Sequence, residues 1–132
     1  MSFIVSQTRQ IMSRAIERYA KERGAQPEAM QLLMKMKDDG VGYFLMRDYR
    51  VEKELTIMDI LGVRVDFKGY SLIAPQFIRQ SLERMVGQYN VSAGDLSVIV
   101  TRRQEIKMYA YNQKNVIGEV TFAYLFGEDA VK

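Results

Sequence analysis

The stretch LSVIVTRRQEIKMYAYNQKNVIGEVTFAYLF, residues 96–126, decides the fold of this 132-residue chain. Two short polar connections, Arg102–Glu105 and Asn112–Asn115, divide it as tight hairpin turns would. The runs between them are rich in β-branched and aromatic residues, which favour strands; they are Leu96–Thr101, Ile106–Tyr111 and Val116–Phe126. The spacing therefore predicts a three-stranded antiparallel meander that closes the fold.

A helix and two strands are expected before the meander. An apolar stripe at helical spacing starts after Pro75, with members Phe77, Ile78, Leu82, Met85, Val86 and Tyr89. Val63–Lys68 alternates strictly between apolar and charged residues, which predicts a half-buried strand. Val41–Met46 has the length and aromatic content of a buried strand. Arg47-Asp48-Tyr49-Arg50 looks like a turn, and Glu52–Leu61 fits either a short helix or an edge strand.

Two helices are expected at the N-terminal end. The first runs from Phe3 to about Arg23 and stops at Gly24; its apolar stripe is Ile4, Thr8, Ile11, Met12, Ala15, Ile16 and Tyr19. Pro27 suits the first position of a second helix, whose series is Met30, Leu33, Met34 and Lys37 before Asp38-Asp39-Gly40. These patterns predict an N-terminal helical hairpin over residues 1–38.

The predicted fold is a single α+β domain covering residues 1–132. Its antiparallel sheet, with the closing meander, packs against the central helix and the N-terminal helical hairpin. The hairpin (1–38) precedes an α+β core (40–126) and a polar tail (127–132). We expect a core that includes Phe44, Val65, Phe67, Ile78, Leu82, Val98, Val100, Val120 and Phe122.

The sequence contains neither Cys nor His. Thiolate metal sites, cysteine nucleophiles and Ser-His-Asp triads are therefore excluded. The carboxylates are scattered over turns and helix ends, and Gly40-Val41-Gly42 lacks the Gly-Lys-Ser/Thr of a phosphate-binding loop. We expect no enzyme activity, no metal and no cofactor.

The net charge of +3 is unevenly distributed along the chain. Residues 1–37 hold seven basic and three acidic side chains, whereas the rest of the chain holds twelve and thirteen. One reading is a basic helix face for nucleic acid or an acidic partner, made by Arg9, Arg14, Arg18 and Lys21. The other is a solvated face with ion pairs within the helix, because Glu17–Lys21 and Arg18–Glu22 have that spacing.

The meander carries a second candidate surface, consisting of Arg102, Arg103, Lys107, Tyr109 and Tyr111. Basic and aromatic side chains interleaved on a sheet suit an acidic protein partner or single-stranded nucleic acid. The alternative is that the tyrosines cover neighbouring strands of the sheet.

The order of elements resembles that of the Roadblock / dynein light-chain group of profilin-like domains. The resemblance covers roughly residues 28–126, with Gly40-Val41-Gly42-Tyr43-Phe44 as a first strand and Phe77–Tyr89 as the central helix. The predicted meander takes the place of the closing strands. The resemblance implies a non-enzymatic, dimeric adaptor or regulator.

A shorter stretch, Asp66 to Phe77, resembles the strand-to-helix turn of STAS-like domains. The resemblance covers a dozen residues. In that group a serine begins the helix, whereas this chain has Ala74, Pro75 or Gln76 there, so phosphorylation of such a serine is not implied.

We therefore expect a protein-binding regulatory, adaptor or inhibitor module that acts through a sheet or helix surface as a homodimer. The alternatives are a nucleic-acid-binding protein that uses the basic helices and the Arg102-Arg103 turn, and a small-molecule-binding or STAS-like domain. No apolar run reaches the length needed to cross a bilayer, and residues 1–7 lack the pattern of a signal peptide. Cytoplasmic localisation, with no membrane partner, is the expectation.

Overall fold

The computed structural model describes residues 3–38, 40–62 and 75–125. Its elements, in chain order, are α1 (Phe3–Glu22), the 3-10 turn η1 (Pro27–Ala29), β1 (Met30–Lys37), β2 (Gly40–Arg47), β3 (Arg50–Leu55), α2 (Ile57–Leu61), α4 (Pro75–Tyr89), β4 (Leu96–Arg102), β5 (Ile106–Asn112), β6 (Asn115–Val120) and α5 (Phe122–Leu125).

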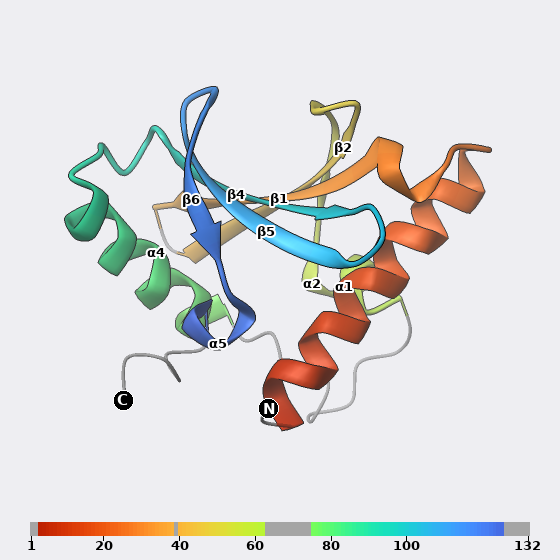
Figure 1. Cartoon of the computed structure of the whole chain (residues 1–132), viewed down its shortest axis with the longest axis horizontal. Helices are drawn as coiled ribbons and strands as arrows, with labels where there is room; N and C mark the ends of the chain where they lie inside the picture. Colours follow the sequence, from red (N-terminus) through yellow and green to blue (C-terminus); the bar gives the residue numbers. More distant parts are fainter. Residues whose placement is uncertain (1–2, 39, 63–74, 126–132) are drawn as a thin grey trace.

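The strands form one six-stranded sheet in the order β3-β2-β1-β4-β5-β6, in which every neighbouring pair is antiparallel. Two three-stranded meanders are thus joined side by side through β1 and β4. All of the drawn helices lie on the same side of the sheet (Figure 1). The α+β class, the antiparallel sheet and the closing meander are confirmed.

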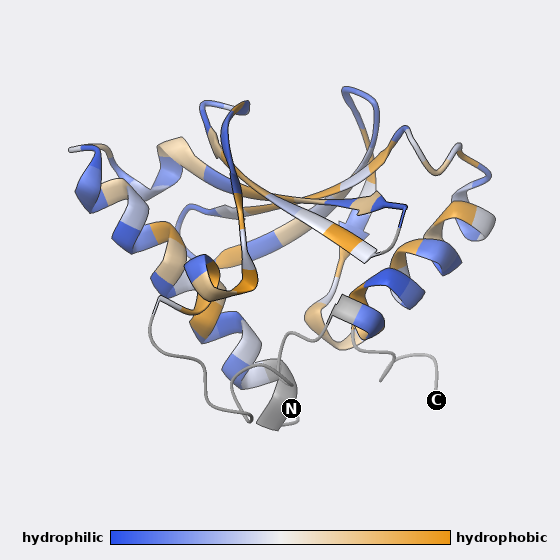
Figure 2. Cartoon of the chain, turned by 180° about the vertical axis from the view of Figure 1, so that it is seen from behind, coloured by the Kyte–Doolittle hydropathy of each residue, from blue (hydrophilic) through white to orange (hydrophobic). Residues whose placement is uncertain are grey.

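The hydrophobic core lies between the sheet and these helices. α1 contributes Met12 and Ile16, and α4 contributes Leu82 and Met85, all at most 2% exposed. Strand residues on this side alternate with residues that face away, as the pleat requires; examples are Leu32, Met34, Leu45, Val98, Val100 and Met108. The hydropathy colouring in Figure 2 shows apolar residues on both helices where they face the sheet.

Residues 50–61, for which two interpretations were open, form an edge strand followed by a short helix. β3 pairs with β2 at the edge of the sheet. A capping box then begins α2: Asp59 N–H donates to Thr56 Oγ1 at 3.1 Å, and Thr56 N–H donates to Asp59 Oδ2 at 2.8 Å. Gly62 ends α2 with φ of +75°, a conformation that glycine adopts without a Cβ penalty.

The predicted second helix of the N-terminal hairpin is wrong. After η1, residues 30–37 form β1, which lies between β2 and β4 in the middle of the sheet. Met30, Leu32 and Met34 have the two-residue period of a strand, and Met30, Leu33 and Met34 have a helical one. β1 has apolar residues on both faces, with Leu32 and Met34 in the core and Leu33 on the opposite face, so its apolar run loses the alternation that identifies a strand.

The last predicted strand is too long. β6 ends at Val120, and residues 122–125 form α5 instead of continuing the sheet. Tyr124 N–H donates to Thr121 Oγ1 at 3.0 Å, which begins a helical turn. Phe122 and Leu125 are both buried at this three-residue spacing, so the turn brings two apolar side chains to the core that a strand would have put on opposite faces.

Six of the predicted core residues are buried: Ile78, Leu82, Val98, Val100, Val120 and Phe122. Phe44 is half-buried and lies on the opposite face of the sheet, beside Leu33. Val65, Phe67, the predicted strand Val63–Lys68 and the polar tail lie outside the described residues.

We expect Leu82→Ala to lower the free energy of unfolding by about 2–5 kcal/mol, because Leu82 is fully buried between α4 and the sheet. Gln80→Ala, at an exposed position on the same helix, is the control and should change it by less than about 0.5 kcal/mol. Urea unfolding followed by circular dichroism measures both. Equal effects of the two substitutions would contradict the packing of α4.

Candidate functional site

The face of the sheet that points away from the helices, here called the open face, is the candidate site. Directly opposed residues of antiparallel strands share a face, and the strand register defines a central row across the sheet. Its members are Glu54, Phe44, Leu33, Ile99, Tyr109 and Glu119. The row is apolar in the middle and ends in a carboxylate on each edge strand.

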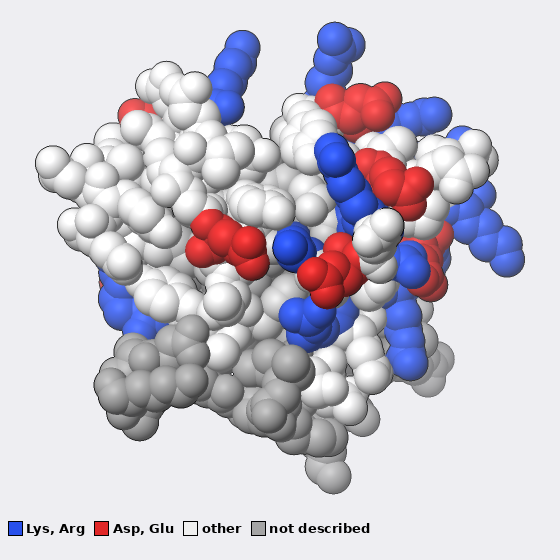
Figure 3. All heavy atoms as spheres, viewed as in Figure 1, with Lys and Arg blue, Asp and Glu red and all other residues white. Residues whose placement is uncertain are grey.

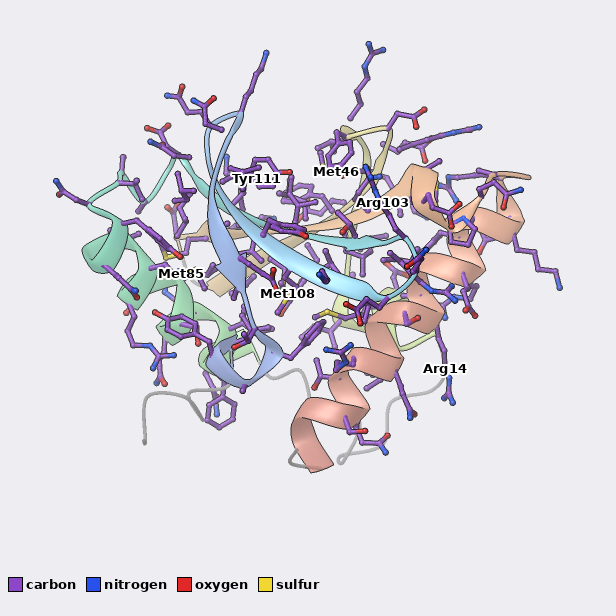
Figure 4. The ribbon with its side chains drawn as sticks, viewed as in Figure 1. Arg14, Met46, Met85, Arg103, Met108 and Tyr111 are labelled. Carbon is purple, nitrogen blue, oxygen red and sulfur yellow. The ribbon has the colours of Figure 1, made fainter. Side chains whose placement is uncertain are left out.

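Two further rows flank the central row. One consists of Val51, Met46, Gln31, Thr101 and Lys107. The other consists of Gly42, Lys35, Ser97, Tyr111 and Val116. Figure 4 shows Met46 and Tyr111 on this face, whereas Met108 lies on the side of the helices.

Leu33, Met46 and Ile99 form a small apolar cluster of their own on the open face. Each is at most 8% exposed, because Phe44 and Tyr111 pack against the cluster. The aromatic rings therefore cover an apolar floor that no helix of the described residues covers.

The open face is hollowed into a groove. Two hollows, with volumes of about 590 and 680 Å³, share Tyr49, Tyr111 and Val116 as lining residues and so form one continuous depression, the sheet groove. The β2–β3 and β5–β6 hairpins rise above the sheet on this side (Figures 1 and 2). The groove thus lies between two raised hairpins.

Tyr49 stands at the rim of the groove on a strained turn. Asp48 and Tyr49 are the two residues that link β2 to β3, and both have positive φ, at 50° and 65°. Turns of this kind favour Asn-Gly because other residues pay a steric penalty in this conformation. The buried Gln31 holds the turn: Tyr49 N–H donates to Gln31 Oε1 at 2.8 Å, and Asp48 N–H donates to Ala29 O at 2.7 Å.

The tyrosine hydroxyls of the groove lie near one another. Burial raises the pKa of Tyr111 above the ordinary value for tyrosine, and the neighbouring hydroxyls of Tyr49 and Tyr109 raise it further. The charged form of Tyr111 is therefore disfavoured, and its ring is a neutral, amphipathic surface at physiological pH.

Cations outnumber carboxylates in the lining of the groove. The cations are Lys35, Arg103, Lys107 and Lys114, and the carboxylates are Asp95 and Glu105. Lys107 Nζ lies 3.5 Å from Glu105 Oε1 in an exposed pair that contributes little stability. The lining thus carries a formal charge of +2, four cations against two carboxylates.

The structure divides the predicted meander surface between two faces. Arg103, Lys107, Tyr109 and Tyr111 line the groove. Arg102 lies on the side of the helices, where its Nη1 is 2.5 Å from Glu17 Oε1 of α1. Adjacent residues of a strand point to opposite faces, which separates Arg102 from Arg103.

The predicted basic helix face is also divided. Arg18 Nη2 donates to the carbonyl of Asp59 at 2.5 Å, and Arg9 lies over the ring of Phe122 at 5.2 Å. Both arginines therefore bind other elements of the fold. Arg14 and Lys21 remain exposed.

Several groove residues were not found from the sequence, chiefly Leu33, Met46, Tyr49 and Val116. Leu33 was assigned to a helix, and the other three face the groove because of strand pairings that the sequence does not specify. The one local signal was the predicted turn at Arg47–Arg50, which places Tyr49 at the tip of a hairpin.

No group of three or more Asp or Glu side chains in residues 3–38, 40–62 and 75–125 is placed to hold a metal ion. Within the same residues, none of the helices has the length and hydropathy needed to cross a bilayer. Comparisons with protein-family models, with curated proteins and with solved structures gave no match.

We expect Tyr49→Gly to raise the free energy of unfolding by about 1 kcal/mol, because glycine adopts positive φ without a steric penalty. Tyr111→Ala should instead lower it, since the Tyr111 ring packs on the cluster of Leu33, Met46 and Ile99. Thermal and urea unfolding of the two variants measure the difference. A loss of more than about 1 kcal/mol in Tyr49→Gly would show that the Tyr49 ring serves the fold itself.

Proposed function

We propose that this protein is a non-enzymatic protein-binding module that holds a partner polypeptide in the sheet groove. The observation that carries the proposal is the one-sided coverage of the sheet. All of the described helices pack on one face, while the other face presents an apolar floor, three tyrosines and a rim of charges. Tyrosine and arginine are enriched at protein interfaces, and such anchors dominate binding energy.

The strained backbone of Tyr49 also supports a binding role. A residue that keeps an unfavourable backbone conformation while it is 44% exposed contributes little to the stability of the free protein. The ring becomes useful when a partner covers it. The resemblance to Roadblock domains took Gly40–Phe44 as the first strand, whereas β1 precedes it in the structure, so the proposal rests on the groove and not on that resemblance.

Single-stranded nucleic acid is the second candidate, because Tyr109 and Tyr111 lie beside Lys107 and could stack on bases. One observation favours a polypeptide instead. The floor of the groove is apolar, since Leu33, Met46 and Ile99 line it, and the apolar side chains of a polypeptide would pack on this floor whereas phosphates would not.

We further propose that the expected homodimer forms through β6. The two edge strands of the sheet differ: β3 carries Arg50, Glu52, Lys53 and Glu54, whereas β6 carries Glu119 as its one charge. Charged side chains are a common protection of an edge against pairing with another chain. Figure 3 shows mostly uncharged atoms on the left of the molecule, around β6, and mixed charges on the right. A second copy that pairs its β6 with this edge meets little charge.

The binding proposal is tested by placing a photo-crosslinking phenylalanine analogue at position 109 instead of Tyr109. The same analogue at position 80, instead of the exposed Gln80 on the far side, is the control. A protein captured from position 109 alone is purified, and its affinity is measured by calorimetry. We expect Tyr109→Ala to weaken binding at least tenfold, since buried tyrosines are frequent hot spots, and Gln80→Ala to leave it unchanged.

Equal capture at both positions, or no binding between the purified proteins, would contradict the proposal. Capture of material that nuclease removes, with an affinity that falls steeply as salt is raised, would support the second candidate instead.

The dimer proposal is tested by light scattering over a hundredfold range of concentration. We expect a dimer of the 15.3 kDa chain at micromolar concentration. Val116→Lys, on the β6 edge, should shift it to monomer, whereas Val51→Lys, on the β3 edge and equally exposed, should not. A monomer at all concentrations would rule out the dimer, and equal effects of the two variants would rule out β6 as its interface.

A further inference from the structure

The strands that form the floor of the sheet groove have no free edges. β2, β1, β4 and β5 each lie between two neighbouring strands. Their backbone N–H and C=O groups are engaged in the sheet, so an occupant of the groove meets side chains rather than backbone partners. An extended segment pressed on this floor would leave its own backbone groups unpaired against Leu33 and Ile99, which is costly.

A helix avoids this cost because its hydrogen bonds are internal. The width of the groove floor also agrees with the diameter of a helix. Three inter-strand spacings separate β2 from β5, which gives a floor about 14 Å wide, and a helix with its side chains is about 10–12 Å across. The raised β2–β3 and β5–β6 hairpins would flank such a helix (Figures 1 and 2).

The charges that line the groove indicate the charge of the helix that would bind there. The cations Lys35 and Lys114 lie in one hollow, and Arg103 and Lys107 lie in the other, so positive charge extends along the groove. A second copy of the chain would bring the same +2 lining against it if two open faces met, which is unfavourable. An acidic partner is complementary in charge.

Resting on the function proposed above, we propose that the sheet groove binds an amphipathic helix of a partner protein. Its apolar stripe packs on Ile99, Tyr109 and Tyr111, and acidic residues at its flanks pair with the lysines of the lining. Apolar residues of such a helix recur at i, i+3, i+4 and i+7. Tyr49 closes over the helix from the rim.

Displayed libraries test this proposal directly. Purified protein is panned against 16-residue helical peptides, against proline-flanked extended peptides and against a pool of single-stranded RNA, with Tyr109→Ala as the counter-selection. We expect enrichment of the helical library, with apolar residues at helical spacing and Asp or Glu beside them. Enrichment of extended peptides or RNA instead, or of no library, would overturn the proposal.

A charge-swap experiment then tests the role of the cations. Fluorescence anisotropy measures binding of an enriched peptide to wild type and to Lys35→Glu with Lys107→Glu. We expect the double variant to lose at least tenfold in affinity, and a peptide with Lys in place of its acidic residues to regain it. Lys21→Glu, at an exposed position of α1 outside the groove, is the control, and this variant should bind the peptide as wild type does. Equal binding by all three proteins would overturn the assignment.

The proposal that the groove binds a protein and the proposal that it binds an acidic helix can fail separately. If the partner captured from position 109 binds the groove through an extended or a basic segment, protein binding stands and the acidic helix is wrong. If nothing is captured there and no library is enriched, both are wrong.

Discussion

The pairing of β1 with β4 is the constraint on which the rest of the structure depends. It joins the two meanders into one sheet, from Gln31 opposite Thr101 to Lys35 opposite Ser97. It places Leu33 beside Ile99 on the open face and Leu32 beside Val100 on the side of the helices. The same five residue pairs thus contribute both to the core and to the floor of the groove. A shift of one residue would exchange the two faces and move Gln31 and Lys35 into the core in place of Leu32 and Met34, so the core fixes the register.

Local patterns were sufficient for elements that a helical apolar stripe or a pair of clear turns identifies. α1 and α4 have apolar stripes at helical spacing, and β4 and β5 are short apolar runs with clear turns between them, so their types were predictable. The type of β1 was not predictable, because its apolar residues lie on both faces and Met30–Met34 fits both a strand period and a helical period. The change from β6 to α5 also escaped prediction, since the benefit of the turn lies in where Phe122 and Leu125 meet the core.

The candidate site was predictable only where its residues belong to a single strand. Alternation within one strand put Lys107, Tyr109 and Tyr111 on a common face, and the same alternation separates Arg102 from Arg103. Leu33 and Met46 required the pairing of strands that are distant in sequence. Arg9 and Arg18 looked like members of a solvated or ligand-binding face because the sequence did not show that α5 and α2 would pack beside α1.

The two proposed interfaces meet at Val116. This residue is on the edge strand β6 and also lines both hollows of the groove, and its side chain is 56% exposed. If a second copy pairs with β6, its sheet continues the first one, and two grooves come to lie near a shared two-fold axis. A partner with two acidic helices could then engage both grooves, and the second contact would be intramolecular. Dimerisation would raise the apparent affinity for such a partner without any new contact in either groove.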